Sequence, residues 1–188
     1  MHLRKVEHMS SSEKVLVVID VQNDFVTGSL GSAAAVEVIP NICKKIEDFD
    51  GGIIVTQDTH DSEYLKTQEG HNLPIVHCIE DTWGHNIERD VFFALIHGYV
   101  LHVINKTIFG ANVLPSVVTR TTTEDLKEII VIGLVTDICV ITNVLLLKTF
   151  FPELTITVDA SCCAGTTPEN HAAALQVMRS CQINVIND

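Results

Sequence analysis

Three side chains whose types could together perform nucleophilic catalysis each follow a run of apolar residues. They are Asp20, Lys106 and Cys139, and the last of them opens an apolar segment with helical spacing. A thiol must lose its proton before it attacks a carbonyl carbon, and a carboxylate within reach can take that proton. An ammonium, or the N-terminus of a helix, favours the resulting thiolate. The pattern favours a cysteine nucleophile; the alternative is that Cys139 is a small apolar residue that packs the first turn of a helix.

The other two members of this set have roles that follow from elementary electrostatics. A lysine buried at a sheet edge needs an acidic partner, so we expect Lys106 to pair with Asp20. Backbone N–H groups in the turn over residues 134–139 could hold the oxyanion that forms when the thiol attacks.

A second group of residues with metal-ligand chemistry begins with an Asp-x-His pair. Asp58 and His60 follow an apolar run, and His77 with Glu69 or His71 could complete a ligand set from the polar stretch that comes next. Mixed nitrogen and oxygen ligands suit Zn²⁺, Mn²⁺ or Fe²⁺ and leave coordination positions for water. Most isolated Asp-x-His pairs bind nothing, so the prediction of a divalent metal ion depends on the additional histidines.

The elements that must position these groups can be read from hydrophobic patterning. Short apolar runs indicate buried parallel strands, at residues 15–19, 53–57, 100–104, 129–132, 154–158 and 182–186. Helical spacing indicates helices at residues 33–49, 87–97, 139–150 and 168–180, with short helical pieces at 113–118 and 123–126. The polar residues 61–85 are expected as one long loop of the kind that carries function.

Strands that alternate with helices predict a three-layer α/β/α fold around a mainly parallel sheet. The carboxyl ends of parallel strands lie along one edge, so the catalytic and metal-ligating residues are expected to converge there. We predict one domain over residues 1–188, with residues 1–13 as a poorly ordered N-terminal extension. Asp159 also follows an apolar run, and we interpret it as the exit of a strand to solvent.

Composition excludes several classes of function. Asp and Glu outnumber Lys and Arg by 24 to 12, and a net charge of −12 without a basic stripe argues against nucleic acid as a partner. No apolar run is long enough to cross a membrane, and the first 14 residues lack the apolar core of a signal peptide. Six cysteines without a Cys-x-x-Cys pair indicate reduced thiols and a cytoplasmic location. Cys162 and Cys163 are neighbours for which we have no mechanism.

Four motifs in this order resemble the isochorismatase-like cysteine hydrolases, and most closely their nicotinamidase branch. They are Ile19-Asp20-Val21-Gln22-Asn23-Asp24-Phe25, the Asp58-x-His60 pair, Lys106, and Gly133-Leu134-Val135-Thr136-Asp137-Ile138-Cys139-Val140. The resemblance extends over residues 15–186 and implies the isochorismatase-like hydrolase fold. It also implies a catalytic triad of Asp20, Lys106 and Cys139, and an oxyanion hole formed by the N–H groups of Val135 and Cys139 after a cis peptide bond.

The resemblance further implies a metal ion, zinc first with manganese or iron as alternatives. The ligands would be Asp58, His60, His77 and Glu69, with His71 competing for the place of Glu69. Phe25 matches a position that lines the substrate pocket. Residues 73–76 lack the aromatic residue that many nicotinamidases carry before the last histidine, and Trp83 follows that histidine instead.

The implied activity is the hydrolysis of a small carboxamide, nicotinamide first, through a thioester on Cys139, by a homodimer or homotetramer. One rival is a hydrolase of the same fold that cleaves N-carbamoyl or ureido compounds and does not need the metal. The other is a non-catalytic member that binds a metabolite or a partner in the same cleft.

Overall fold

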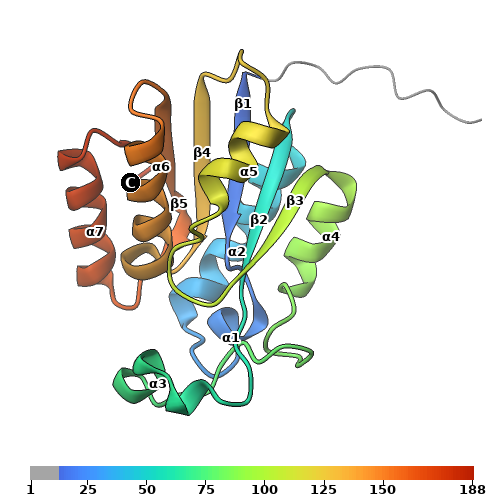
Figure 1. Ribbon diagram of the computed structural model, residues 1–188, viewed down its shortest axis with the longest axis vertical. Coiled ribbons are helices and arrows are strands. Elements are labelled where there is room, and N and C mark those ends of the chain that lie inside the picture. Colours follow the sequence, from blue (N-terminus) through green and yellow to red (C-terminus); the bar gives the residue numbers. More distant parts are fainter. Residues whose placement is uncertain (1–12) are drawn as a thin grey trace, which may run out of the picture.

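The computed structural model describes residues 13–188, and its centre is a sheet of six parallel strands (Figure 1). The strands lie in the order β3-β2-β1-β4-β5-β6. Their bounds are β1 (Lys14–Ile19), β2 (Gly52–Asp58), β3 (Tyr99–Lys106), β4 (Glu128–Leu134), β5 (Thr155–Ala164) and β6 (Asn184–Ile186). The predicted α/β fold with a mainly parallel sheet is confirmed. Residues 1–12 of the predicted N-terminal extension lie outside the described residues.

Helices cover both faces of the sheet because the central strands are apolar on both sides. One face packs against α2 (Ala33–Glu47) and α4 (Arg89–His97). The other face packs against α5 (Leu114–Thr121), α6 (Ile141–Phe150) and α7 (Pro168–Ser180) (Figure 1). Along β1, Leu16 and Val18 point to the first layer, and Val15 and Val17 point to the second. This alternation produces two cores and makes β1 the buried middle of the molecule.

The structure differs from the predicted elements at several places. Residues 61–85 are not one structureless loop, because η1 (Tyr64–Lys66) and α3 (Gln68–Asn72) lie within them. Residues 123–126 form a turn and no helix. Pro40 lies inside α2, which begins at Ala33 as expected, where the Oγ of Ser32 accepts a hydrogen bond from Ala35 N.

The carboxyl ends of the central strands lie at one edge of the sheet, beside the short helix α1 (Asn23–Val26) and α3 (Figure 1). Asp20 follows β1, while Asp58 and Lys106 are the last residues of β2 and β3. After β4 the chain enters a π-helical turn, η2 (Thr136–Val140), which carries Cys139. Residues that are far apart in the sequence therefore meet at this edge. Within residues 13–188, none of the helices has the length and apolar character needed to cross a membrane.

Candidate active site

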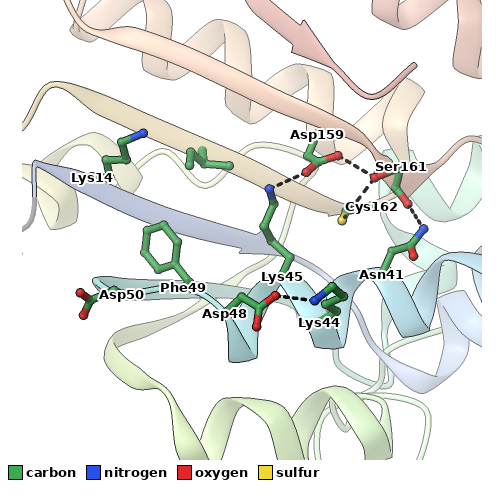
Figure 2. A pocket seen from close by; sticks show the side chains of 11 residues that line it. Lys14, Asn41, Lys44, Lys45, Asp48, Phe49, Asp50, Asp159, Ser161 and Cys162 are labelled. Carbon is green, nitrogen blue, oxygen red and sulfur yellow. Dashed lines mark hydrogen bonds and ion pairs between the residues drawn. The ribbon is translucent and has the colours of Figure 1, made fainter.

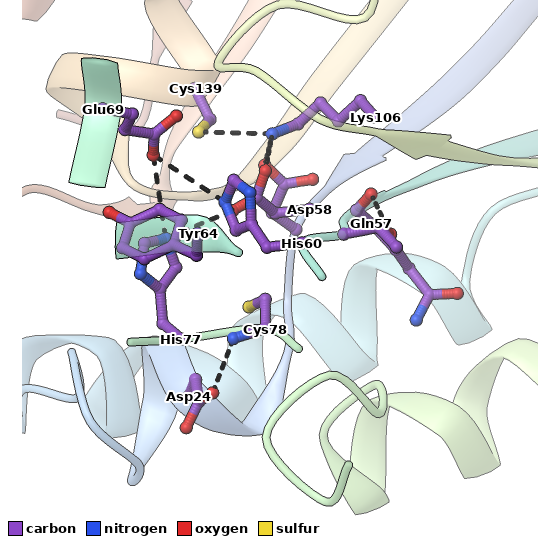
Figure 3. A network of polar contacts seen from close by, with 12 residues as sticks. Asp24, Gln57, Asp58, His60, Tyr64, Glu69, His77, Cys78, Lys106 and Cys139 are labelled. Carbon is purple, nitrogen blue, oxygen red and sulfur yellow. Dashed lines mark hydrogen bonds and ion pairs between the residues drawn. The ribbon is translucent and has the colours of Figure 1, made fainter. Parts of the chain in front are cut away.

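The ammonium of Lys106 lies at the centre of the polar groups that the strand ends bring together. Its Nζ is 2.7 Å from Asp20 Oδ2, 3.0 Å from Asp58 Oδ1 and 3.6 Å from Cys139 Sγ. Figure 3 shows the last two contacts and the approach of the lysine from the end of β3. Lys106 is 4% exposed and Asp20 is fully buried. The predicted pairing of Lys106 with Asp20 is therefore present, and the same ammonium also contacts the metal-ligand group.

Asp20 is held by its backbone and by a neighbouring hydroxyl. Its φ of 47° lies in the left-handed region, which Asp tolerates better than most residues. Thr56 Oγ1, from β2, donates a hydrogen bond of 2.6 Å to Asp20 Oδ1. Burial raises the pKa of Asp20 above its usual value, although the ammonium of Lys106 acts in the opposite direction. A carboxylate with a raised pKa is suited to accept a proton and return it.

The thiol of Cys139 differs from the sequence-based expectation of a favoured thiolate. Burial raises its pKa well above the usual value, the carboxylate of Asp20 raises it further, and Lys106 lowers it only in part. Loss of solvation outweighs the nearby ammonium because the side chain is almost completely buried. Burial thus disfavours the thiolate, and a base close to the sulfur would assist its attack.

The turn that carries Cys139 is anchored to the start of α7. The carboxylate of Asp137 accepts hydrogen bonds from Thr166 N at 2.8 Å and Thr166 Oγ1 at 2.5 Å. Thr136 Oγ1 lies 2.8 Å from His171 Nδ1. The peptide bond between Leu134 and Val135 is cis, at the position that the resemblance implied.

Four side chains beside the lysine form a group that could hold a metal ion. The ligand atoms of Asp58, His60, Glu69 and His77 all lie within 4.8 Å of one another. Asp58 Oδ2 is 3.0 Å from His60 Nε2 and 3.4 Å from His77 Nε2, and Glu69 Oε1 is 3.8 Å from each of these nitrogens (Figure 3). Ligands about 2.0–2.1 Å from a tetrahedral Zn²⁺ are about 3.3 Å apart. The donor set and its spacing therefore fit a divalent cation.

Electrostatics in this group also favour a cation. Burial and the charge of Asp58 raise the pKa of Glu69. Burial opposes the charge on Asp58, but hydrogen bonds with the two histidines lower its pKa below the usual range. His77 Nδ1 lies 2.8 Å from Ile75 O, which turns Nε2 toward the carboxylates. Two carboxylates in a buried site repel each other, and a bound cation relieves that repulsion.

Sequence reasoning missed two residues that build the metal-ligand group. The ring of Tyr64 lies 4.7 Å from that of His60 and 4.9 Å from that of His77, and Tyr64 Oη donates to Leu73 O at 2.9 Å. Gln22 exchanges two hydrogen bonds of 2.8 Å with the backbone of Asp58. A large aromatic residue in an otherwise polar stretch was the available signal for Tyr64.

The remaining predicted positions are divided between the site and the surface. The ring of Phe25 is buried and lies 5.7 Å from that of His77, so it borders the metal-ligand group. Trp83 is 60% exposed. His71, which competed with Glu69, is exposed at the end of α3 and does not belong to the group.

Asp159 is not at the end of a strand, as the sequence suggested, but within β5 and buried. Its carboxylate pairs with Lys45 of α2 at 2.6 Å and accepts a hydrogen bond of 2.7 Å from Ser161 Oγ (Figure 2). A cavity of about 580 Å³ lies beside this pair, and Cys162 also lines it. Lys45 satisfies the buried carboxylate, so Asp159 has a structural role.

Comparison with known proteins agrees with the fold. The model of the isochorismatase domain family matches residues 14–187. The nicotinamidase of Saccharomyces cerevisiae is 28% identical over 117 residues, which is 46% of this chain and 54% of that protein; the match spans about half of the length of this relative.

Two solved structures share the fold. The crystal structure of the nicotinamidase/pyrazinamidase of Bacillus subtilis is 23% identical with a TM-score of 0.79, over 92% of this chain and 98% of that chain. The pyrazinamidase of Pyrococcus horikoshii in complex with zinc is 20% identical with a TM-score of 0.74, over 94% and 99% of the two chains.

Proposed function

The chain belongs to the isochorismatase family, and from this premise we propose that it hydrolyses nicotinamide to nicotinate and ammonia. The observation that carries the proposal is the position of one ammonium, Lys106 Nζ, which contacts the acid Asp20, the thiol Cys139 and the metal ligand Asp58. A nucleophile, its base and a group fit for a cation are thereby combined in a single site. The similar proteins with this fold are named as nicotinamidases or pyrazinamidases.

In the first half of the reaction, Asp20 takes the proton of the Cys139 thiol while the sulfur attacks the carboxamide carbon. Lys106 compensates the charge of both groups. The N–H groups of Val135 and Cys139 hold the oxyanion. Asp20 then returns the proton to the leaving nitrogen, so that ammonia departs and a thioester remains on Cys139.

In the second half, a water molecule attacks the thioester carbon and Asp20 accepts its proton. The carbon–sulfur bond breaks, the thiol regains a proton, and the carboxylic acid leaves. The sum is one amide and one water converted to one acid and one ammonia. The raised pKa of Asp20 suits these repeated proton transfers.

We propose Zn²⁺ as the cation, held by Asp58, His60, Glu69 and His77. When bound, it would supply a coordination position beyond these four ligands, by expansion to five-coordinate, for the ring nitrogen of a pyridine carboxamide, and so would orient the amide toward the thiol. Phe25, beside His77, would border the ring of the substrate.

Ammonia release from a panel of compounds tests the activity. With zinc added, the wild-type protein should release ammonia from nicotinamide, chelation should stop it, and Cys139→Ala should be inactive while it still binds zinc. If the protein hydrolyses an N-carbamoyl compound faster than nicotinamide, and this activity persists in chelator, the rival hydrolase replaces the proposal. No turnover of any compound, together with an unreactive Cys139, would favour the binding module.

We also propose that two copies of the chain associate through β3 and α4. β3 is an edge strand whose lysine, Lys106, is buried, and its exposed side chains are apolar except for His102 and Asn105. The exposed apolar residues of the two elements are Phe92, Phe93, Ile96, Tyr99, Val100 and Val103. Edge strands that remain monomeric are usually protected by charge, proline or a covering segment. A two-fold axis at this edge would pair β3 with its copy.

The surface offered is of the right order for a dimer. Six apolar side chains, each about half exposed, provide roughly 500 Å² of accessible surface. The flanking backbone adds to this area, and a standard interface buries about 800 Å² on each partner. The six apolar residues carry no charge, and the neighbouring exposed Arg89 and Asp90 of α4 carry opposite charges, so this patch adds little repulsion between two copies of a chain whose net charge is −12. Val103→Lys should convert a dimer to a monomer in light scattering, whereas Val177→Lys on exposed α7 should not. A wild-type monomer at 100 µM, roughly the concentration at which weak dimers form, would refute this interface.

A further inference from the structure

A buried asparagine one helical turn after Cys139 has no role in the chemistry described above. Asn143 is fully buried in α6, next to the apolar Val144. Its Nδ2 donates to Cys139 O at 2.8 Å and to Phe109 O at 3.1 Å, and its Oδ1 accepts from Ala111 N at 2.8 Å. A buried amide is costly unless it is hydrogen-bonded. Here both hydrogens of the amide and its oxygen are used.

These hydrogen bonds join two parts of the site that the sheet does not join. Phe109 and Ala111 belong to the loop that follows Lys106, and Cys139 O belongs to the π-helical turn. In the sheet, β2 and β1 separate the strand that ends at Lys106 from the strand that leads to Cys139. The ladder of backbone hydrogen bonds therefore fixes the distance between the two segments only through two intervening strands.

The loop and the helix are also in close steric contact at this point. A Cβ on Gly110 would lie 2.8 Å from Thr142 Cγ2, so the loop backbone lies directly against α6. Because one Nδ2 binds both carbonyl oxygens, Phe109 O and Cys139 O are at most about 6 Å apart. Asn143 thus sets how closely the loop after Lys106 approaches the turn that carries the nucleophile.

We propose that Asn143 is a positioning residue, which holds the Lys106 end of β3 against the Cys139 turn so that Nζ and Sγ remain 3.6 Å apart. The inference rests on the proposed function, because it assigns Asn143 to the same cysteine chemistry. Without the amide, the loop and the turn can separate, and the ammonium no longer compensates the thiolate. A displacement of about 1 Å in an active site can cost about 100-fold in rate.

The test compares Asn143→Ala with Val144→Ala, which removes a buried apolar side chain from the adjacent position. Both variants lose stability, but Val144 makes none of the hydrogen bonds of Asn143 with the loop. We expect kcat for nicotinamide to fall about 30–100-fold in Asn143→Ala with KM within about twofold of wild type. Val144→Ala should keep kcat within about threefold. Equal losses in the two variants would overturn the proposal, since they would show a general effect of destabilisation.

Asn143→Ser separates the hydrogen bond to Cys139 O from the hydrogen bonds to the loop. It also provides a variant if Asn143→Ala does not fold. A serine can bond back to Cys139 O, as Thr142 Oγ1 does to Ile138 O at 2.6 Å, but it is too short to reach the loop. We expect Asn143→Ser to be as slow as Asn143→Ala. Wild-type turnover in Asn143→Ser would overturn the proposal, because the bonds to Phe109 and Ala111 would then be dispensable.

A second measurement does not depend on the substrate. The rate at which iodoacetamide alkylates Cys139, followed by peptide mass spectrometry, should fall about fivefold or more in Asn143→Ala and stay near wild type in Val144→Ala. Equal alkylation rates in Asn143→Ala and wild type would overturn the proposal. If the wild-type protein does not hydrolyse nicotinamide, the proposed function fails, and these relative alkylation rates still decide the role of Asn143.

Discussion

Replacing Lys106 by methionine removes the positive charge on which two buried carboxylates depend. The ammonium lies 2.7 Å from Asp20 Oδ2 and 3.0 Å from Asp58 Oδ1, and these residues are 0% and 3% exposed. Methionine retains most of the apolar stem, so the change is mainly electrostatic. Breaking a buried ion pair from one side costs about 3–5 kcal/mol, because the remaining charge loses its ammonium and gains no water in return.

The assay is urea unfolding followed by circular dichroism in the presence of a chelator, so that no cation replaces the missing charge. With a slope of about 2 kcal/mol per molar urea, the unfolding midpoint of Lys106→Met should fall by about 2 M. Lys44→Met is the matched control. Its ammonium pairs with Asp48 on the surface, where both side chains are more than half exposed, so the midpoint should not change measurably.

A double variant shows whether charge is the cause. In Lys106→Met/Asp20→Asn one of the two carboxylates is neutral, so repulsion is relieved and the midpoint should recover by at least half of the loss. A midpoint as low as that of Lys106→Met would show that the loss comes from packing of the lysine stem. A wild-type midpoint in Lys106→Met itself would refute the buried ion-pair network that the site depends on.

Three further predictions concern other parts of the molecule. The pKa of Asp159 is lowered, because the groups that donate to it outweigh the effect of burial; its stabilisation is present above the unfolded value of about 3.9 and is lost as pH falls below it. Asp159→Asn should therefore unfold at a lower temperature than wild type at pH 7, and the difference should shrink as pH falls through the lowered pKa of the folded protein; a constant difference would contradict this pairing. His77→Ala should weaken zinc binding by at least about tenfold in a chelator competition assay, whereas His71→Ala should leave it unchanged; equal effects would mean that the ligand set is wrong. Gly133→Ala should unfold at a clearly lower temperature, because the φ of Gly133 is +122° and a Cβ there would lie 2.1 Å from Ile19 O. An unchanged Tm would show that β1 and β4 can separate at this point.

Much of the site could be predicted because a parallel sheet has a simple geometry. Apolar runs located the strands, and a polar residue directly after a buried strand must lie at the carboxyl edge. Asp20, Asp58, Lys106 and Cys139 were found in this way, and the structure places their side chains in contact through Lys106 Nζ.

Other features depend on how segments pack, which local patterning does not encode. Glu69 and His71 are both polar residues in α3, and only the orientation of that helix places Glu69 among the metal-ligand atoms. Asp159 ends an apolar run in the sequence, but β5 continues to Ala164, because Cys163 and Ala164 pair with β4 again after a register shift. Pattern alone cannot detect this continuation.

The sequence by itself determined the fold class, the strand ends that carry chemistry and the kinds of reactive group available, because hydrophobic periodicity and residue type are local properties. Only the tertiary structure decided the proton affinity of those groups and the contacts between them. Burial in the surrounding core raises the pKa of the Cys139 thiol, and Lys106 joins Asp20 to Asp58 because three strands end beside one another. Asn143 stands within an apolar helix in the sequence, and its partners Phe109 and Ala111 become visible only when the chain has folded. Burial and long-range hydrogen bonds are properties of the packed chain, and they control proton affinity and position in this site.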